Sequence, residues 1–245
     1  MKEPIFIVDG VRTPFAKAGT TLADTEAVEL GKTAVSLLLA RTGIDAAKIE
    51  EVIIGCVGQP ADAANVARVV ALRAGVPESI PAITVHRNCA SGFEAITQAA
   101  EKMIAGSGDV FVVGGVESMS QIPMLYDYET AKKFSALARA KNLGQKLGIL
   151  SSFRPSDFKP LIGLELELLD PVSGCNMGQT AENLSRDFDV SREDQDEFAM
   201  NSHHKAVAGR ERLREEITPF YLTKFKNGKP CVGGGQGGAL WLSRN

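Results

Sequence analysis

Short apolar runs in the first 119 residues separate longer segments whose apolar residues recur every three or four positions. Short apolar runs are typical of buried strands. Apolar residues that recur every three or four positions are typical of helices packed on a sheet. The alternation predicts a layered α/β fold with a mainly parallel sheet. The expected strands cover residues 5–8, 52–54, 81–85 and 110–113. One expected helix is capped by Asp24, and two others cover residues 63–74 and 90–105.

Between residues 120 and 228 the alternation stops and helical patterns predominate, over 129–147, 179–188 and 192–208. Ser191 and Asp194 have the spacing of a capping box. Asn227-Gly228 between two apolar runs predicts a hairpin. We therefore expect an α/β domain over 1–119, a helical cap or loop domain over 120–228, and a separate tail over 229–245.

Composition indicates a globular enzyme in a reducing compartment, here assigned to the cytoplasm. The chain has 245 residues, of which 44% are apolar and 23% charged, with a net charge of −3. That charge gives no field that would attract DNA or RNA, so nucleic acid is not an expected partner. No apolar run approaches the roughly 20 residues of a membrane-spanning helix.

The four cysteines, Cys56, Cys89, Cys175 and Cys231, are widely spaced and form neither a C-x-x-C pair nor a metal-ligand cluster. Cys89 lies where an expected strand meets an expected helix. Free N–H groups and the helix dipole at such a point favour the thiolate form, which attacks carbonyl groups. A buried structural cysteine is the alternative interpretation for Cys89 alone.

Four motifs resemble those of thiolases in order and spacing: VDGVRTPF (8–15), HRNCASG (86–92), GGVESMS (114–120) and NMGQTAEN (176–183). The resemblance covers about residues 4–230. It implies the N-terminal half of a thiolase-type fold and an acyl-CoA C-acyltransferase. The middle segment is similar to the cap of thiolases in fatty-acid oxidation complexes, which implies a role in β-oxidation.

The resemblance also implies the roles of individual residues. Cys89 would carry the acyl group, and its backbone N–H would be one oxyanion donor. Asn176 and Met177 would line the acyl pocket, with capping and packing of the next helix as the alternative. From the residues themselves, we expect a tight turn at Gly114-Gly115 beside the nucleophile, because the Gly-Lys-Ser/Thr of a phosphate loop does not follow. Arg12 is expected to belong to an ion pair or to an interface. The family uses no metal and no redox cofactor, and coenzyme A is a substrate.

The resemblance stops after Val232, where five of the next six residues are glycine. Such a segment cannot bury side chains, so we expect disorder there. The histidine of the family's Gly-His-Pro motif does not occur in this sequence, and the cysteine of its Cys-x-Gly motif belongs to the family's second half, which the resemblance does not cover. We therefore expect a truncated or frame-shifted chain with low or no activity alone.

Two other functions are compatible with these residues. A non-catalytic thiolase-like subunit or acyl-CoA-binding fragment would not need the missing pair. A β-ketoacyl synthase shares the fold and the cysteine, but the flanking motifs favour thiolase. Expected partners are coenzyme A thioesters, a second copy in a homodimer, and a full-length thiolase or fatty-acid oxidation subunit.

Overall fold

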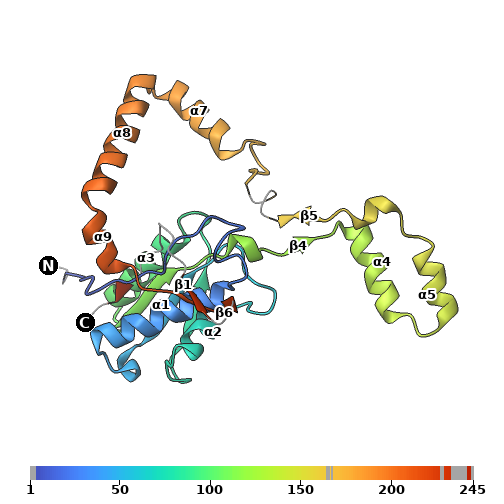
Figure 1. The fold of residues 1–245 in the computed structure, drawn as a ribbon, viewed down its shortest axis with the longest axis horizontal. Helices are drawn as coiled ribbons and strands as arrows, with labels where there is room; N and C mark the ends of the chain where they lie inside the picture. Colours follow the sequence, from blue (N-terminus) through green and yellow to red (C-terminus); the bar gives the residue numbers. More distant parts are fainter. Residues whose placement is uncertain (1–3, 164–165, 167, 227–228, 233–241, 244–245) are drawn as a thin grey trace. The chain divides into compact units, whose positions relative to one another are not determined.

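The computed structural model describes residues 4–163, 166, 168–226, 229–232 and 242–243, and side chains as far as Tyr221. The chain forms two compact units, described separately below. Unit 1 combines residues 1–121 with 195–245, and unit 2 comprises residues 122–194. Figure 1 shows the order of the elements along the chain.

The central sheet of unit 1 is mainly parallel, as the alternating pattern predicts. Its middle strand β1 (Glu51–Gly55) pairs in parallel with β2 (Ala82–Val85) and β3 (Phe111–Gly115). The two-residue strand β8 (Leu242–Ser243) pairs with β3 in the antiparallel direction. The strand order is β2-β1-β3-β8.

Helices cover both faces of this sheet and create two cores. Val52 and Ile54 of β1 face the core that contains α1 (Ala27–Thr42) and α2 (Val66–Arg73). Ile53 faces the opposite core, which contains α3 (Ser91–Ile104). These three side chains are fully buried, and burial of one such side chain stabilises the fold by about 1.5–3 kcal/mol. The result is a three-layer α/β arrangement.

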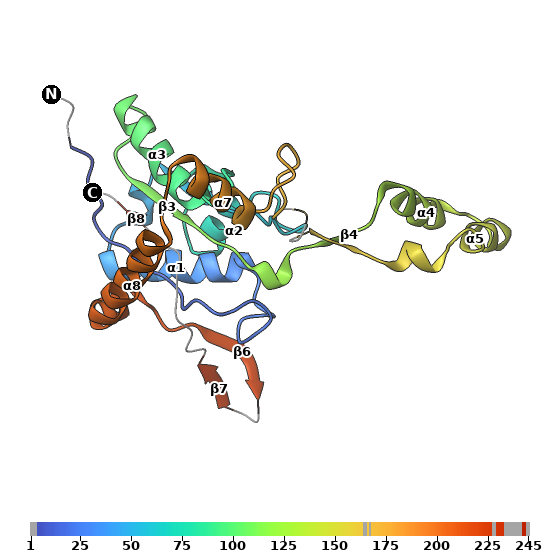
Figure 2. The ribbon, with the colours of Figure 1, turned by 90° about the horizontal axis from the view of Figure 1, so that it is seen from above.

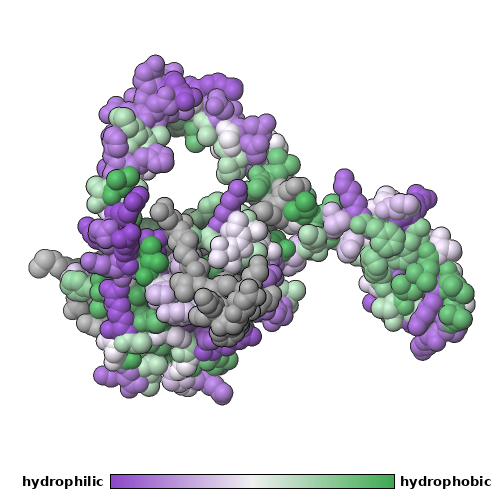
Figure 3. Space-filling model, in the orientation of Figure 1, coloured by the Kyte–Doolittle hydropathy of each residue, from purple (hydrophilic) through white to green (hydrophobic). Residues whose placement is uncertain are grey.

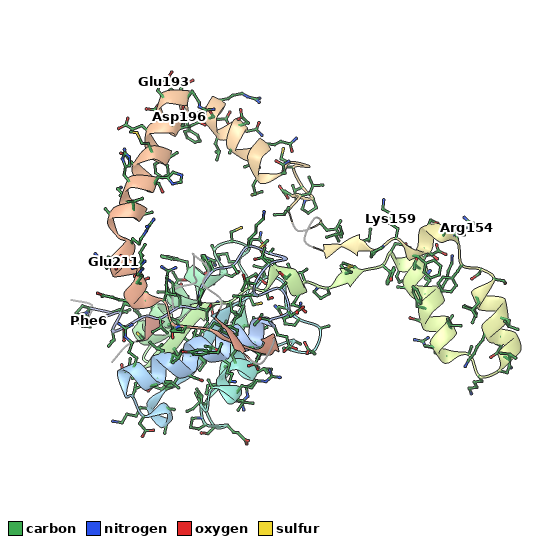
Figure 4. The ribbon with its side chains drawn as sticks, viewed as in Figure 1. Phe6, Arg154, Lys159, Glu193, Asp196 and Glu211 are labelled. Atoms are coloured by element: carbon green, nitrogen blue, oxygen red, sulfur yellow. The ribbon has the colours of Figure 1, made fainter. Side chains whose placement is uncertain are left out.

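Unit 1 also contains two short 3-10 helices over Ala46–Lys48 and Met119–Gln121 and, from residue 195 onward, most of one helix and the elements after it. Helix α8 (Arg192–Ala208) begins where the sequence predicts, and Ser191 and Asp194 form the expected reciprocal cap. Glu193 and Asp196 lie at this end of α8 (Figure 4). Helix α9 (Arg210–Glu216) follows, and the predicted hairpin is confirmed as β6 (Tyr221–Lys226) with β7 (Lys229–Val232) (Figure 2). Its turn lies outside the described residues.

Unit 2 contains a short two-stranded sheet and helices. Strands β4 (Met124–Leu125) and β5 (Leu161–Ile162) are antiparallel. Helices α4 (Tyr128–Arg139) and α5 (Leu143–Leu150) and the 3-10 helix η3 (Pro155–Phe158) lie between them, and α7 (Met177–Asp187) follows.

A small aromatic cluster holds the α4–α5 region together. Phe134 of α4 lies 5.1 Å from Tyr126, 5.0 Å from Phe153 and 6.4 Å from Phe158, measured between ring centroids. An ion pair between Lys133 and Asp157 ties α4 to η3. Hydrophobic residues remain on the outer surface of this region (Figure 3), among them Leu143 and Leu147.

Three local predictions are wrong. Residues 5–8 form no strand, and their side chains are 40–62% exposed. Helix α1 begins after Glu26 instead of being capped by Asp24. The expected helix over 129–147 is broken after residue 139, because Asn142 adopts an extended conformation and its side chain caps α5 instead.

Unit 2 begins near residue 120, as the sequence suggests. It ends at residue 194, whereas the predicted cap domain extends to residue 228. The three-domain assignment stays a prediction. Residues 229–232 form the second strand of the predicted hairpin and residues 242–243 form β8, so these stretches of the 229–245 tail are strands. The expected disorder over 233–238 lies outside the described residues. Within the described part of the chain, no helix combines the length and apolar character that crossing a bilayer requires.

Candidate active site

Cys89 lies in the loop between β2 and α3, where the sequence places it, and it is exposed. Asn88, immediately before it, has a positive φ of 45°. Few residues other than glycine adopt this conformation, although asparagine does so more readily than most. The chain therefore turns sharply at Asn88 and presents Cys89 at the start of α3.

The hydroxyl group of Ser91 closes this turn. It accepts a hydrogen bond from the backbone N–H of Arg87 at 2.8 Å and donates one to the carbonyl oxygen of Asn88 at 2.6 Å. The backbone N–H of Ser91 donates to the same carbonyl group at 3.0 Å. Ser91 is only 4% exposed, so the two residues before Cys89 are tied to the first residue of α3.

Glycines at the ends of two strands allow α3 to approach the sheet. A Cβ atom on Gly55 of β1 would lie 2.3 Å from the carbonyl carbon and oxygen of Ser91. A Cβ atom on Gly115 of β3 would lie 3.0 Å from the Cα of Gly92. Gly115 thus packs closely beside the start of α3, but the tight turn expected at Gly114-Gly115 is not formed, because both residues belong to strand β3.

Two acidic side chains support the neighbouring loops. The Glu117 carboxylate accepts backbone hydrogen bonds from Val57 at 2.9 Å and Gly58 at 3.0 Å, at the end of β1. Glu94 on the first turn of α3 is 9% exposed and forms a 2.9 Å ion pair with Arg87. The buried carboxylate therefore has a cationic partner from the cysteine loop.

The groups around Cys89 fit nucleophilic chemistry. Its backbone N–H and those of Gly92 and Phe93 have no acceptor among the described residues, which leaves donors near the thiol. The His86 ring lies in the same loop, and its Nδ1 accepts a 3.4 Å hydrogen bond from the Asn88 N–H. Among the described residues, no group of histidine, cysteine and acidic side chains is arranged to hold a metal ion.

Asn176 and Met177 belong to unit 2, whereas Cys89 belongs to unit 1. Asn176 caps α7: its Oδ1 accepts the Gln179 N–H at 2.9 Å, and the Gln179 side chain accepts the Asn176 N–H at 2.9 Å. Asn176 therefore has the capping role, and the assignment of Asn176 and Met177 to the acyl pocket stays a prediction. Met177 is the first residue of α7 and is 56% exposed.

Arg12 is a member of a structural ion pair. Its side chain is nearly buried, and Nε lies 3.2 Å from a carboxylate oxygen of Glu216 on α9. A cavity of about 260 Å³ borders this pair and includes none of the residues of the cysteine loop. Its other charged lining residues include Arg41 and Asp9, which also pair with each other.

The remaining cysteines and histidines are dispersed. Cys56 is buried with its sulfur 3.8 Å from a carboxylate oxygen of Glu117, Cys175 is a partly exposed free thiol, and the Cys231 side chain lies outside the described residues. His203 and His204 are exposed on α8.

Sequence reasoning missed the supporting roles of Ser91 and Glu117. Both lie inside recognised motifs, HRNCASG and GGVESMS. A buried serine two residues after a candidate nucleophile offers no periodic signal, because its partners are backbone groups that every residue carries.

Comparison with known proteins gives a consistent result. The family described as "Thiolase, N-terminal domain" matches residues 5–233. A 3-ketoacyl-CoA thiolase of Pectobacterium atrosepticum is 38% identical over 224 residues, 91% of this chain and 51% of that protein. A Yersinia pestis 3-ketoacyl-CoA thiolase is 37% identical over the same shares.

The structural comparison agrees with these sequence matches. The crystal structure of the Bacillus anthracis acetyl-CoA acetyltransferase is similar, with a TM-score of 0.77, 26% identity, and coverage of 97% of this chain and 64% of that one. The chain thus spans about half the length of the curated relatives it matches. From its sequence and its fold, the chain belongs to the thiolase family.

Proposed function

We propose that the chain takes part in acyl transfer from 3-ketoacyl-CoA, with Cys89 as the residue that carries the acyl group. The observation that supports this most strongly is the position of an exposed thiol in a strained turn at the start of α3. Family membership supports the class of reaction.

The proposed reaction has two steps. The Cys89 thiolate attacks the keto carbon of the substrate, and the bond between that carbon and C2 breaks. The electron pair leaves as the enolate of acetyl-CoA, which takes up the proton lost by the thiol. A new CoA thiol then attacks the Cys89 thioester and releases acyl-CoA, and the proton of that CoA thiol returns to the Cys89 sulfur, which restores the starting thiol.

The groups of the cysteine loop would assist these steps. The backbone N–H of Cys89 would donate to the oxyanion of each tetrahedral intermediate. Asn176 and Met177 would line the acyl pocket, as the resemblance of their motif to that of thiolases implies. Coenzyme A enters as a substrate, and the reaction needs no metal or redox cofactor.

The biological setting is part of the same proposal. We place the chain in β-oxidation and in the cytoplasm, and the relatives named 3-ketoacyl-CoA thiolase support the class of substrate. The candidate partners are a second copy of this chain, a full-length thiolase and a fatty-acid oxidation subunit.

Exchange of labelled coenzyme A into acetyl-CoA tests the acyl-transfer step without a 3-keto substrate. The wild-type chain is expected to catalyse slow exchange, and Cys89→Ala to abolish it. Cys175→Ala is the matched control, because it removes a free thiol of unit 2, and it should exchange as the wild type does. Equal exchange by Cys89→Ala would contradict the proposal, and no exchange by the wild type would favour a non-catalytic subunit.

A further inference from the structure

We infer that Ser91 is a positioning residue for Cys89: its hydroxyl group holds the turn that presents the thiol at the start of α3. This inference rests on the proposed role of Cys89 as acyl carrier. It assigns Ser91 a function through its hydrogen bonds, without contact with substrate.

The first observation is the double use of one buried hydroxyl. Ser91 Oγ accepts from the Arg87 N–H and donates to the Asn88 carbonyl oxygen, at 2.8 and 2.6 Å. Both partners precede Cys89, and Ser91 follows it. The hydroxyl therefore bridges the two sides of the loop that carries the thiol.

The second observation is the conformation that this bridge maintains. A φ of 45° at Asn88 is unfavourable relative to the ordinary extended or helical regions. Hydrogen bonds from surrounding groups must offset that cost. Without the hydroxyl, Asn88 can return to negative φ, which moves Cys89 away from the free N–H groups of α3.

The third observation is that Ser91 itself cannot move. The close approach of its carbonyl group to Gly55 fixes its backbone against β1. Because Ser91 is only 4% exposed, water has little access to the hydrogen-bonding groups that its hydroxyl group serves. Ser91 is thus a fixed point to which the loop is attached, and the Arg87–Glu94 ion pair is a second attachment of the same loop.

Alkylation of Cys89 by iodoacetamide, measured peptide by peptide in the mass spectrometer, tests the inference without substrate. Cys175 in the same molecule is the internal reference, because it is a free and partly exposed thiol of unit 2. Ser91→Ala is expected to lower the ratio of the Cys89 rate to the Cys175 rate by about tenfold, since it removes two hydrogen bonds of a buried group.

Two further variants separate positioning from general stability. Thr97→Val removes a hydroxyl of the same helix that bonds only to Glu94, and it should leave the ratio within about twofold, because the loop bonds persist. Ser91→Thr retains the hydroxyl and should retain most of the wild-type ratio. An unchanged ratio in Ser91→Ala, or an equal loss in Thr97→Val, would overturn the inference.

Hydrogen exchange of the wild-type protein decides the question even if Ser91→Ala fails to fold. The Arg87 amide, bonded to Ser91, should exchange more slowly than the Cys89 amide, and equally fast exchange would overturn the inference. These readouts need no acyl transfer. If labelled coenzyme A does not exchange into acetyl-CoA, that result counts against the proposed function. The role of Ser91 is then still decided by alkylation.

Discussion

Gly55 at the end of β1 faces the carbonyl group of Ser91 with no room for a side chain between them: a Cβ atom would lie 2.3 Å from that group. The sheet and the helix that follows Cys89 therefore meet through backbone. Because both contacting groups are main-chain atoms, neither can rotate away as a side chain would. This contact fixes the position of the cysteine loop relative to the sheet.

Gly55→Ala is expected to destabilise unit 1 by about 1–3 kcal/mol, the usual cost of forcing extra atoms into a packed interior. The matched control is Gly92→Ala, whose added Cβ would have its nearest neighbour at 3.6 Å, an ordinary contact. Urea unfolding of the three proteins measures the difference. Equal free energies of unfolding for Gly55→Ala and wild type would show that the contact relaxes without cost.

The positive φ of Asn88 predicts that the position discriminates between residue types. Asn88→Val should lower the free energy of unfolding by about 1–2 kcal/mol, because a β-branched residue is strongly disfavoured in this conformation. Asn88→Gly should be tolerated, because glycine adopts positive φ readily. The comparison is made by urea unfolding, and a valine variant as stable as the glycine variant would contradict the observed turn.

The carboxylate of Glu117 uses one oxygen for each of two backbone N–H groups, those of Val57 and Gly58. In Glu117→Ala both amides lose their acceptor, and we expect destabilisation of about 1–3 kcal/mol. In Glu117→Gln only one oxygen remains. Hydrogen exchange should therefore show both amides deprotected in the alanine variant and one in the glutamine variant, whereas continued protection of both in alanine would contradict the role of Glu117.

Asp127 gives the stability of unit 2 a dependence on pH. The backbone N–H of Thr130, followed by its hydroxyl group, holds the pKa of Asp127 below its ordinary value. A carboxyl group whose pKa is lowered by folding stabilises the folded state at pH values above its unfolded pKa of about 4. This stabilisation is lost as the pH falls through the folded pKa.

Asp127→Ala should consequently melt at a lower temperature than wild type at pH 7, and the difference should shrink as the pH falls below about 4. Asp127→Asn is the control, because it retains an uncharged cap whose contribution does not titrate in this range. Calorimetry of the three proteins from pH 7 to acid measures these differences. A gap between wild type and Asp127→Ala that is independent of pH would contradict the assignment.

Much of unit 1 follows from local sequence pattern. Strands β1 to β3 and helix α3 were predictable because burial on both faces produces continuous apolar runs, and burial on one face produces helical spacing. The cap formed by Ser191 and Asp194 was predictable because its partners are close in sequence. Cys89 was predictable as a candidate because a motif and a strand-to-helix boundary coincide there.

The features that sequence reasoning missed depend on contacts between distant segments. An apolar run such as 5–8 becomes a strand only if a neighbouring strand and a covering layer are present, which the run itself does not reveal. The approach of Gly55 to Ser91 joins residues 36 positions apart in the numbering of the chain. The Glu117 carboxylate likewise binds a loop about 60 positions away.

The most direct test of the account is the mass of the intact protein after incubation with acetoacetyl-CoA, followed by peptide mapping. One added acetyl group is expected on the peptide that contains Cys89, removed again by free coenzyme A and absent in Cys89→Ala. An unmodified wild-type protein, or an acetyl group that persists in Cys89→Ala, would contradict the assignment of Cys89 as the acyl carrier.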